Sequence, residues 1–397
     1  MTDFCKTRSL FHLPAGVIYL DGNSLGPLPR AAVARINSMM QDEWGEMLIG
    51  GWNRAGWLNQ PARVGDRIAR LIGAAPGTVV MGDTLTIKVY QALASALAIN
   101  AERRIIVSDS GNFPSDLYTA QGLIESLDRG HELRLCAPEA VEDHLSEEVA
   151  VLMLTEVDYK TGRLHDMKAL TAKAHAQGIV TVWDLAHSAG ALPVQLEQAG
   201  ADFAVGCSYK YLNSGPGGPA FIYVAPGLVD NLRPVLAGWL GHEDPFSFDL
   251  DYRPGAGIKR MRVGTPPVLQ LTALEASLDI WDLVDMNELR EKSIELSDFF
   301  IERVEAGCPD LVLASPRDGR QRGSQVSFHF EQGYAAMQAL IAHGVIGDFR
   351  APDIMRFGIT PLYIDAEDVR QAAETIEQIM TDRLWDNAAY RQRSTVT

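Results

Sequence analysis

Residues 181–218 read TVWDLAHSAGALPVQLEQAGADFAVGCSYKYLNSGPGG and hold two short apolar runs, each followed by charged side chains. Asp184 ends the run that starts at residue 179, and Lys210 follows the run at 203–205. Short apolar runs bounded by turn formers are typical of buried strands. Open parallel sheets gather their chemistry at the carboxyl ends of the strands. We therefore expect Asp184 and Lys210 at the ends of neighbouring strands.

The same alternation of apolar runs and helical patterns continues along the chain. Strands are expected at residues 78–81, 104–107, 133–136, 150–154, 179–183, 203–205, 220–224 and 325–330. Helices are expected at residues 31–40, 63–71, 82–99, 114–127, 167–177, 274–303 and 366–384. This order predicts an α/β fold with a mostly parallel central sheet, helices on both of its faces and a smaller C-terminal α+β domain.

Two segments near the start are rich in large apolar side chains. The helix expected at 31–40 gathers Val33, Ile36 and Met40 on one side. Residues 44–57 mix tryptophan with glycine and show neither a helical nor a strand period. Such a segment either lines a pocket for an aromatic ligand or is a surface loop that buries its own tryptophans.

The composition excludes several classes of partner. The chain has 397 residues, of which 47% are hydrophobic and 22% charged, as in ordinary globular proteins. Its 35 basic and 51 acidic residues give a formal charge of −16, which repels nucleic-acid phosphates and anionic membrane surfaces. There is no apolar stretch long enough for a membrane span and no signal-peptide core. We expect a cytoplasmic protein that binds neither nucleic acid nor membrane.

The cysteines and histidines indicate no metal site. Cys5, Cys136, Cys207 and Cys308 are widely scattered, so neither a disulfide framework nor a zinc site is expected. His242 lies in a crowded His-Glu-Asp cluster without the spacing of metal ligands.

A polar turn at residues 82–86 opens one of the expected helices and is a candidate anion site. Its glycine and its hydroxyl side chains leave backbone N–H groups free at a helix start. The alternative is ordinary N-capping by Asp83 or Thr84. No nucleotide-binding glycine motif occurs at such a turn. An anion cradle, Asp184 as partner for a ring cation and Lys210 as a reactive amine together match the requirements of pyridoxal phosphate.

Five separated stretches carry a resemblance to a known family. They are YLDGNSLGPLP at 19–29, GNFPSD at 111–116, DLAHSAG at 184–190, SYKYLNSGPGG at 208–218 and RFGITPLY at 356–363. In these stretches and in their order the chain resembles the kynureninases, which belong to the fold type I pyridoxal-phosphate enzymes. The resemblance implies pyridoxal 5′-phosphate as cofactor. It also implies three regions: an N-terminal segment (1–30) that packs on the small domain and lines the site, a large cofactor-binding domain (31–273) and a small C-terminal α+β domain (274–397).

The resemblance also implies roles for individual residues. Lys210 corresponds to the lysine that forms a Schiff base with the cofactor, Asp184 to the aspartate that keeps the pyridine nitrogen protonated, and Tyr209 to a proton donor or oxyanion partner. Phe113 corresponds to the aromatic plate on the cofactor ring. Other implied cofactor neighbours are Leu85, Thr86, Asp116, Thr155 and His187.

Further residues are implied to act at the substrate or across a subunit boundary. Trp239 and Thr265 match positions that reach the cofactor phosphate of the other subunit, which implies a homodimer with shared active sites. Arg356 resembles the arginine that binds the substrate α-carboxylate. Ser24, Trp52 and His242 are implied to border the substrate.

The implied reaction is hydrolytic cleavage of the Cβ–Cγ bond of L-kynurenine to anthranilate and L-alanine, in tryptophan catabolism and in the supply of NAD precursors. The pair Gly264-Thr265 resembles the bacterial pattern, and Trp52 offers no acceptor for a ring hydroxyl. Both features favour kynurenine over 3-hydroxykynurenine as substrate.

Two alternatives differ in chemistry. A cysteine desulfurase shares the fold, the aspartate and the lysine, but it needs a thiol on a mobile C-terminal loop, and no cysteine follows Cys308. A non-catalytic pyridoxal-phosphate protein, such as a regulator, would usually carry a basic DNA-binding module, and the chain has no basic run.

Overall fold

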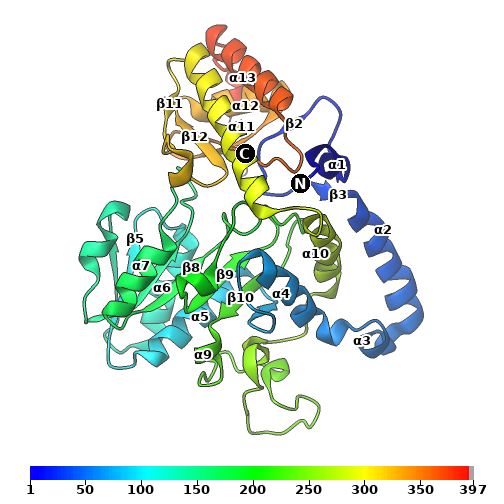
Figure 1. Cartoon of the computed structure of the whole chain (residues 1–397), viewed down its shortest axis with the longest axis vertical. Helices are drawn as coiled ribbons and strands as arrows, with labels where there is room; N and C mark the ends of the chain where they lie inside the picture. Colours follow the sequence, from blue (N-terminus) through cyan, green and yellow to red (C-terminus); the bar gives the residue numbers. More distant parts are fainter. Residues whose placement is uncertain (393–397) are drawn as a thin grey trace.

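A seven-stranded sheet lies at the centre of the chain in a computed structural model that describes residues 1–392 (Figure 1). Its strands follow the order β4 (Val79–Met81), β10 (Ala220–Val224), β9 (Phe203–Cys207), β8 (Val180–Asp184), β7 (Val149–Thr155), β5 (Ile105–Asp109) and β6 (Glu132–Cys136). Only β10 runs against the others, since it pairs antiparallel with both β4 and β9. The prediction of a mostly parallel sheet is confirmed.

Alternate residues of the strands enter two separate cores. Val80 and Val151 pack with α5 (Leu85–Ile99) and α6 (Pro114–Leu127) on one face. Met81 and Leu152 belong to the core on the other face, which takes in the helices α4 (Gln60–Leu71), α7 (Met167–Ala176) and α10 (Val268–Trp281). Because helices cover both faces, the strands are apolar on both sides and stand out in the sequence as continuous apolar runs.

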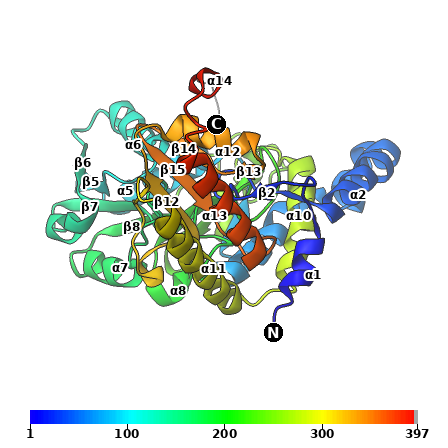
Figure 2. The same cartoon turned by 90° about the horizontal axis from the view of Figure 1, so that it is seen from above.

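The C-terminal part is built on a second, smaller sheet. Its four antiparallel strands are β11 (Val312–Leu313), β12 (Gln325–His329), β15 (Ile354–Gly358) and β14 (Asp348–Arg350). Two helices, α11 (Met286–Gly307) and α13 (Ala366–Thr381), pack side by side over it (Figure 2). This is the predicted α+β arrangement.

The single helix expected at residues 274–303 is wrong. The chain forms α10 and α11 instead, separated at Asp282–Asp285. Asp285 has an extended backbone, and its carboxylate accepts hydrogen bonds from the N–H groups of Asn287 and Glu288. It thereby caps a new helix.

The N-terminal segment lies against the C-terminal part of the chain (Figure 1). It comprises α1 (Phe4–Ser9) and the short strands β1 (Phe11–His12), β2 (Ile18–Tyr19) and β3 (Leu28–Pro29). β2 pairs in parallel with β13 (Val345–Ile346). Arg8 of α1 binds the carboxylate of Asp368. These contacts position the turn at residues 21–26 beside the edge of the small sheet.

The expectation for residues 44–57 is corrected, because this segment is largely helical. It continues from α2 (Arg30–Ser38) through η1 (Met39–Gly45), η2 (Leu48–Gly50), α3 (Gly51–Arg54) and η3 (Trp57–Asn59). Elements of three to seven residues are too short to leave a periodic pattern. The buried ring of Trp57 lies where a Cβ on Gly51 would be, so the glycine permits this packing.

All four cysteines are free, with Cys5 exposed and the other three buried. Among the helices formed by residues 1–392, none combines the length and the hydropathy needed to cross a bilayer.

Candidate active site

Lys210 stands in a small cavity at the carboxyl ends of the central strands. Asp184 ends β8 and Lys210 follows the neighbouring parallel strand β9, so the prediction of neighbouring strand ends is confirmed. The cavity has a volume of about 140 Å³. Its lining comprises Asn23, Ser24, Leu85, Phe113, Asp184, Ala186, His187, Tyr209, Lys210, Arg350 and Arg356.

His187 and two aromatic rings surround the amine of Lys210. Its Nζ lies 3.1 Å from Nε2 of His187 and 5.9 Å from the ring centroids of both Phe113 and Tyr209. Burial, and then the charge of Lys210, lower the pKa of His187 well below its usual range. The imidazole is therefore neutral and able to accept a hydrogen bond from the amine. The Cys207 side chain and burial raise the pKa of Tyr209, which keeps its phenol protonated.

Asp184 and Asp116 are two buried carboxyl groups that form no ion pair in the described part of the chain. Within residues 1–392, Oδ2 of Asp116 also has no hydrogen-bond partner. Burial raises the pKa of Asp184 to about 6, although Lys210 opposes this. Burial and the charge of Asp184 raise the pKa of Asp116 well above its usual range. A protonated pyridine nitrogen is the kind of cation that fits such a site.

Two helices begin at the cavity and provide an anion cradle. Leu85 is the first residue of α5, and Phe113 directly precedes α6. Neither N-cap residue, Thr84 or Phe113, caps its helix with its side chain, and Asp83 instead pairs with Lys88 at 2.9 Å. The alternative that Asp83 or Thr84 caps the helix α5 with its side chain is therefore wrong. The hydroxyls of Thr86 and Ser115 lie 3.1 Å apart in the two first turns, so N–H and O–H donors converge there.

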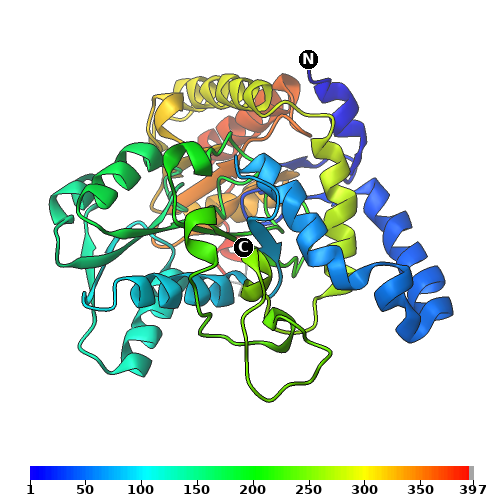
Figure 3. The ribbon, with the colours of Figure 1, turned by 60° about the horizontal axis from the view of Figure 1, so that its bottom comes forward.

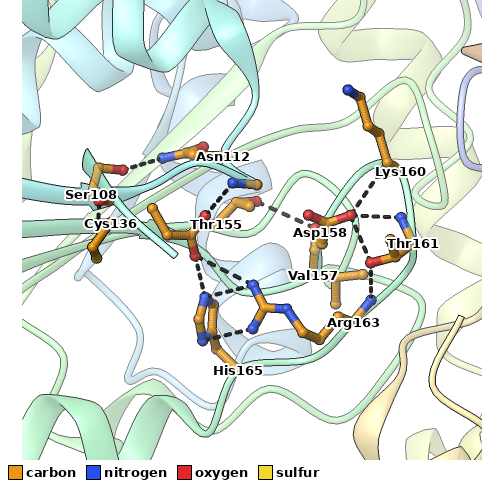
Figure 4. A network of polar contacts seen from close by, with 12 residues as sticks. Ser108, Asn112, Cys136, Thr155, Val157, Asp158, Lys160, Thr161, Arg163 and His165 are labelled. Atoms are coloured by element: carbon orange, nitrogen blue, oxygen red, sulfur yellow. Dashed lines mark hydrogen bonds and ion pairs between the residues drawn. The ribbon is translucent and has the colours of Figure 1, made fainter. Parts of the chain in front are cut away.

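The loop between β7 and α7 supports the ring of Phe113. Tyr159 packs edge-on against Phe113, with the ring centroids 5.0 Å apart. Asp158 holds this loop, because its Oδ1 accepts hydrogen bonds from the backbone of Lys160 and Thr161 (Figure 4). Thr155 lies at the start of the same loop, beside Asp184 in the sheet register, with its hydroxyl 3.4 Å from the Asp184 carbonyl oxygen.

A buried ionic network lies beneath this loop. Oδ2 of Asp109, at the end of β5, lies 2.5 Å from His165 Nε2 and 3.3 Å from the guanidinium of Arg163. Burial alone would raise the pKa of Asp109, but the hydrogen bond of His165 and the charge of Arg163 outweigh it and hold the pKa below its usual value. Both partners appear at the lower centre of Figure 4. The network ties residues 163–165, in the second half of the loop that carries Tyr159, to the end of β5.

Arg356 joins the N-terminal segment, the loop and the small sheet. Its Nε donates to Asp348 Oδ1 at 2.6 Å, and its Nη2 donates to Asp348 Oδ2 and, at 3.0 Å, to Ser24 Oγ. Its Nη1 donates to the carbonyl oxygen of Tyr159. The burial of Asp348 favours a higher pKa, but the hydrogen bond and the charge of Arg356 outweigh it and hold the pKa of Asp348 below its usual value. The guanidinium is thus fixed and charged at one end of the cavity.

Trp52, Trp239 and Thr265 come together, but in a different hollow. They line a cavity of about 380 Å³ with Ile49, Asn53, Leu58, Leu240 and Phe246. His242 lies in an adjoining hollow, which Trp239 also lines. None of the four lines the cavity of Lys210. Within one chain the expected site residues therefore form two groups.

Several residues at the site were not among the candidates taken from the sequence. Arg350 and Asn23 line the cavity, Asp348 holds Arg356, and Ser115 and Tyr159 contact Thr86 and Phe113. Asn23 and Ser115 lie inside motifs that the sequence made conspicuous. Arg350, Asp348 and Tyr159 carry no local signal, because their proximity to the site depends on tertiary contacts.

Comparison with known proteins adds a family relationship. Residues 289–376 match the model of the kynureninase C-terminal domain. The chain is 49% identical to kynureninase from Pseudomonas fluorescens over 98% of its length and 95% of the relative, and equally so to kynureninases from Burkholderia pseudomallei and Burkholderia mallei.

Solved structures show the same fold at low identity. The cysteine desulfurase from Thermococcus onnurineus NA1 has a TM-score of 0.80 and 18% identity, covering 95% of this chain and 98% of that one. The cysteine desulfurase CsdA from Escherichia coli has the same values, with 96% and 99% covered. A C-DES variant with glycine covalently linked to its pyridoxal-phosphate cofactor also has a TM-score of 0.80 at 18% identity, with 95% and 99% covered. At this identity the likeness concerns the fold alone.

Proposed function

Since the chain belongs to the kynureninase family and is an enzyme that hydrolyses kynurenine with pyridoxal phosphate, we propose that L-kynurenine is preferred over 3-hydroxykynurenine. The observation that carries this preference is the lining of the second hollow, where Trp52, Trp239 and Phe246 present aromatic faces. Such faces suit an aminophenyl ring, and Asn53 and Thr265 are the only polar side chains besides the indoles in this lining, so an added ring hydroxyl has few partners to compensate its desolvation. The cysteine desulfurase and non-catalytic alternatives are set aside by the family relationship.

We propose a homodimer in which the second hollow of one subunit meets the Lys210 cavity of the other. The large apolar residues around it are exposed: Trp44, Leu48, Ile49, Trp239, Phe246, Phe248 and Leu250. Residues 242–256 project from the body of the molecule beside this surface (light green, bottom of Figure 3). Val33 and Met40, on the apolar side expected for the first long helix, are exposed as well. Five of these exposed side chains, Ile49, Trp239, Phe246, Phe248 and Leu250, line the two adjoining hollows. Clusters of exposed apolar side chains mark protein interfaces, which supports a second copy of the chain as the partner.

Four residues that line the Lys210 cavity have proposed tasks at the cofactor ring and the substrate Cα. When bound, pyridoxal phosphate supplies an electron sink for the bond cleavages at the substrate. Asp184, with Asp116 beside it, holds the ring nitrogen protonated, and Phe113 covers the ring face. Lys210 carries the cofactor at rest and moves the proton of the substrate Cα during turnover. His187, being neutral, leaves the amine of Lys210 free of competing charge.

The remaining site residues are proposed to hold the phosphate and the substrate. Leu85, Thr86 and Thr155 belong to the surroundings of the cofactor phosphate, and Trp239 and Thr265 reach it from the partner subunit. Tyr209 donates a proton to the oxygen of the γ-carbonyl as water adds. Arg356 binds the α-carboxylate, with Ser24, Trp52 and His242 at the border of the substrate.

The proposed division of the chain follows the same assignments. The segment 1–30 lines the site, residues 31–273 bind the cofactor, and residues 274–397 form the small domain, of which 393–397 lie outside the residues that the structure describes. We place the enzyme in the cytoplasm, in the breakdown of tryptophan and in the supply of NAD precursors.

The fluorescence of anthranilate, or of 3-hydroxyanthranilate from the hydroxylated substrate, tests the proposal directly. Wild-type protein and Lys210→Ala are each mixed with pyridoxal phosphate and either L-kynurenine or 3-hydroxykynurenine. We expect a higher kcat/KM for L-kynurenine in the wild type and loss of turnover in Lys210→Ala. A higher kcat/KM for the hydroxylated substrate would refute the preference, and full activity of Lys210→Ala would refute the role of the lysine.

A further inference from the structure

Arg350 places a second guanidinium at the cavity of Lys210. It ends β14 and lines the cavity together with Arg356. Its side chain is 34% exposed, whereas that of Arg356 is 2% exposed. Of the two cations that line the cavity, Arg350 is the more exposed.

The hydrogen bonds of Arg356 leave it short of donors for a carboxylate. A guanidinium has five N–H groups, and Arg356 uses one each on Oδ1 and Oδ2 of Asp348, on Ser24 Oγ and on the Tyr159 carbonyl oxygen. One N–H remains. A bidentate grip on a carboxylate requires two parallel donors, so Arg356 cannot provide it alone without giving up a protein partner.

Arg350 has the donors that Arg356 lacks. Its Nη1 donates to the carbonyl oxygen of Phe349 at 2.9 Å, and its Nη2 lies 2.8 Å from Asp348 Oδ2 and 3.5 Å from Ser24 Oγ. Within the described part of the chain, its Nε–H and one Nη1–H have no partner. Asp348 and Ser24 thus contact both guanidiniums and hold them side by side.

The charges of this cluster favour one added anion. Arg350 and Arg356 face Asp348, which is ionised, and Asp21, which lies close to all three. Burial and then the charge of Asp348 raise the pKa of Asp21 to about 7. When Asp21 is protonated, two cations face a single carboxylate, and one further carboxylate neutralises the cluster.

We propose that Arg350 binds the substrate α-carboxylate jointly with Arg356, and that this shared grip selects an amino acid over the corresponding amine. The inference rests on the proposed function, because it takes L-kynurenine as the substrate and Arg356 as one of the groups that bind it. Arg356 supplies a fixed donor and Arg350 supplies the free ones. The two residues are only six positions apart, on adjacent strands of the small sheet.

The test compares Arg350→Gln with the wild type and with Arg320→Gln, a control at an arginine whose side chain is 86% exposed. The probes are L-kynurenine, its decarboxylated analogue as a competitive inhibitor, and L-alanine, whose binding is followed by the absorbance of the bound cofactor. Arg350→Gln should raise KM for L-kynurenine and weaken L-alanine binding about 10- to 100-fold, since charge-assisted hydrogen bonds of this kind are lost. The kcat value and the inhibition constant of the analogue should change by less than about threefold.

Other outcomes separate the inference from the proposed function. Unchanged KM and unchanged L-alanine affinity in Arg350→Gln would overturn the role of Arg350, as would an equal weakening of the decarboxylated analogue. Arg350→Lys, which keeps the charge without the fork, should give intermediate values and provides a second variant if the glutamine variant does not fold. Absence of anthranilate from the wild type would overturn the proposed function alone, because L-alanine binding still reports on Arg350.

Discussion

Asp184→Asn is expected to make the cofactor-free protein more stable while it weakens cofactor binding. Burial raises the pKa of Asp184 from 3.8 to about 6 in the folded chain. The folded state therefore keeps a proton that the unfolded state has released, and stability falls as the pH rises from about 4 to about 6. The gap of about 2 pH units corresponds to about 3 kcal/mol. Asparagine removes this cost and keeps an oxygen for the N–H of Ala186, which now donates to Asp184 at 2.8 Å.

Asp109→Asn provides a matched control with the opposite sign. Asp109 is also buried at the end of a strand, but its pKa is lowered by His165 and Arg163 against the effect of burial. Its ionised form stabilises the fold above the usual aspartate pKa and loses this effect as the pH falls below it. Removing one member of a buried ion pair costs about 3–5 kcal/mol. We expect Asp109→Asn to be destabilised at pH 8 by an amount of this order.

Urea unfolding of the cofactor-free proteins at pH 4.5 and pH 8 measures both effects. At pH 8 the free energy of unfolding of Asp184→Asn should exceed that of the wild type by up to about 3 kcal/mol, and the difference should shrink at pH 4.5. The absorbance of bound pyridoxal phosphate should show weaker binding by Asp184→Asn. Equal or lower stability of Asp184→Asn at pH 8 would refute the view of Asp184 as a buried charge that awaits a cation.

Two further predictions concern the proposed dimer interface and the contact of Tyr159 with Phe113, the proposed cover of the cofactor ring. Phe248 and Leu250 are 75% and 100% exposed, and replacing both by serine should shift the protein from dimer to monomer in sedimentation velocity and lower kcat. Val312, which is 61% exposed on the small sheet, is the control, and Val312→Ser should change neither property. A stable, active dimer of the double variant would contradict the proposed interface. Tyr159→Leu keeps the backbone carbonyl that binds Arg356 but loses the ring contact with Phe113. Pyridoxal phosphate should therefore bind about 3- to 10-fold more weakly in a fluorescence titration. Unchanged affinity would show that the ring of Phe113 needs no such support.

The sequence predicted most of what depends on local pattern. The strands are buried on both faces, so their apolar runs could be recognised, and with them the places of Asp184 and Lys210 at neighbouring strand ends. The break at residues 282–285 was missed because the residues around it are compatible with a helix. It depends on the cap that Asp285 makes with the first turn of α11.

The part of the site that the sequence did not predict depends on contacts between distant segments. Arg350 reaches the cavity because Asp348 and Ser24 hold it, and Ser24 lies on a turn that β2 brings to the small sheet by pairing with β13. Neither contact leaves a periodic signal. Trp52 and Trp239 are far apart in sequence, so that their common hollow likewise depends on the folded chain.

The two aspartates at the ends of strands show where the sequence stops being informative. The stretches IIVSD at 105–109 and VTVWD at 180–184 follow the same pattern, an apolar strand that ends in a buried carboxylate. His165 and Arg163, more than fifty positions further on, neutralise Asp109 and make it part of the framework. Within residues 1–392 no basic side chain forms an ion pair with Asp184, and the charge of Lys210 and the hydrogen bonds from Ala186 and Asp116 offset its burial only in part. What distinguishes a cofactor partner from a structural ion pair is thus the missing counterion, and this can be seen only once the chain is folded.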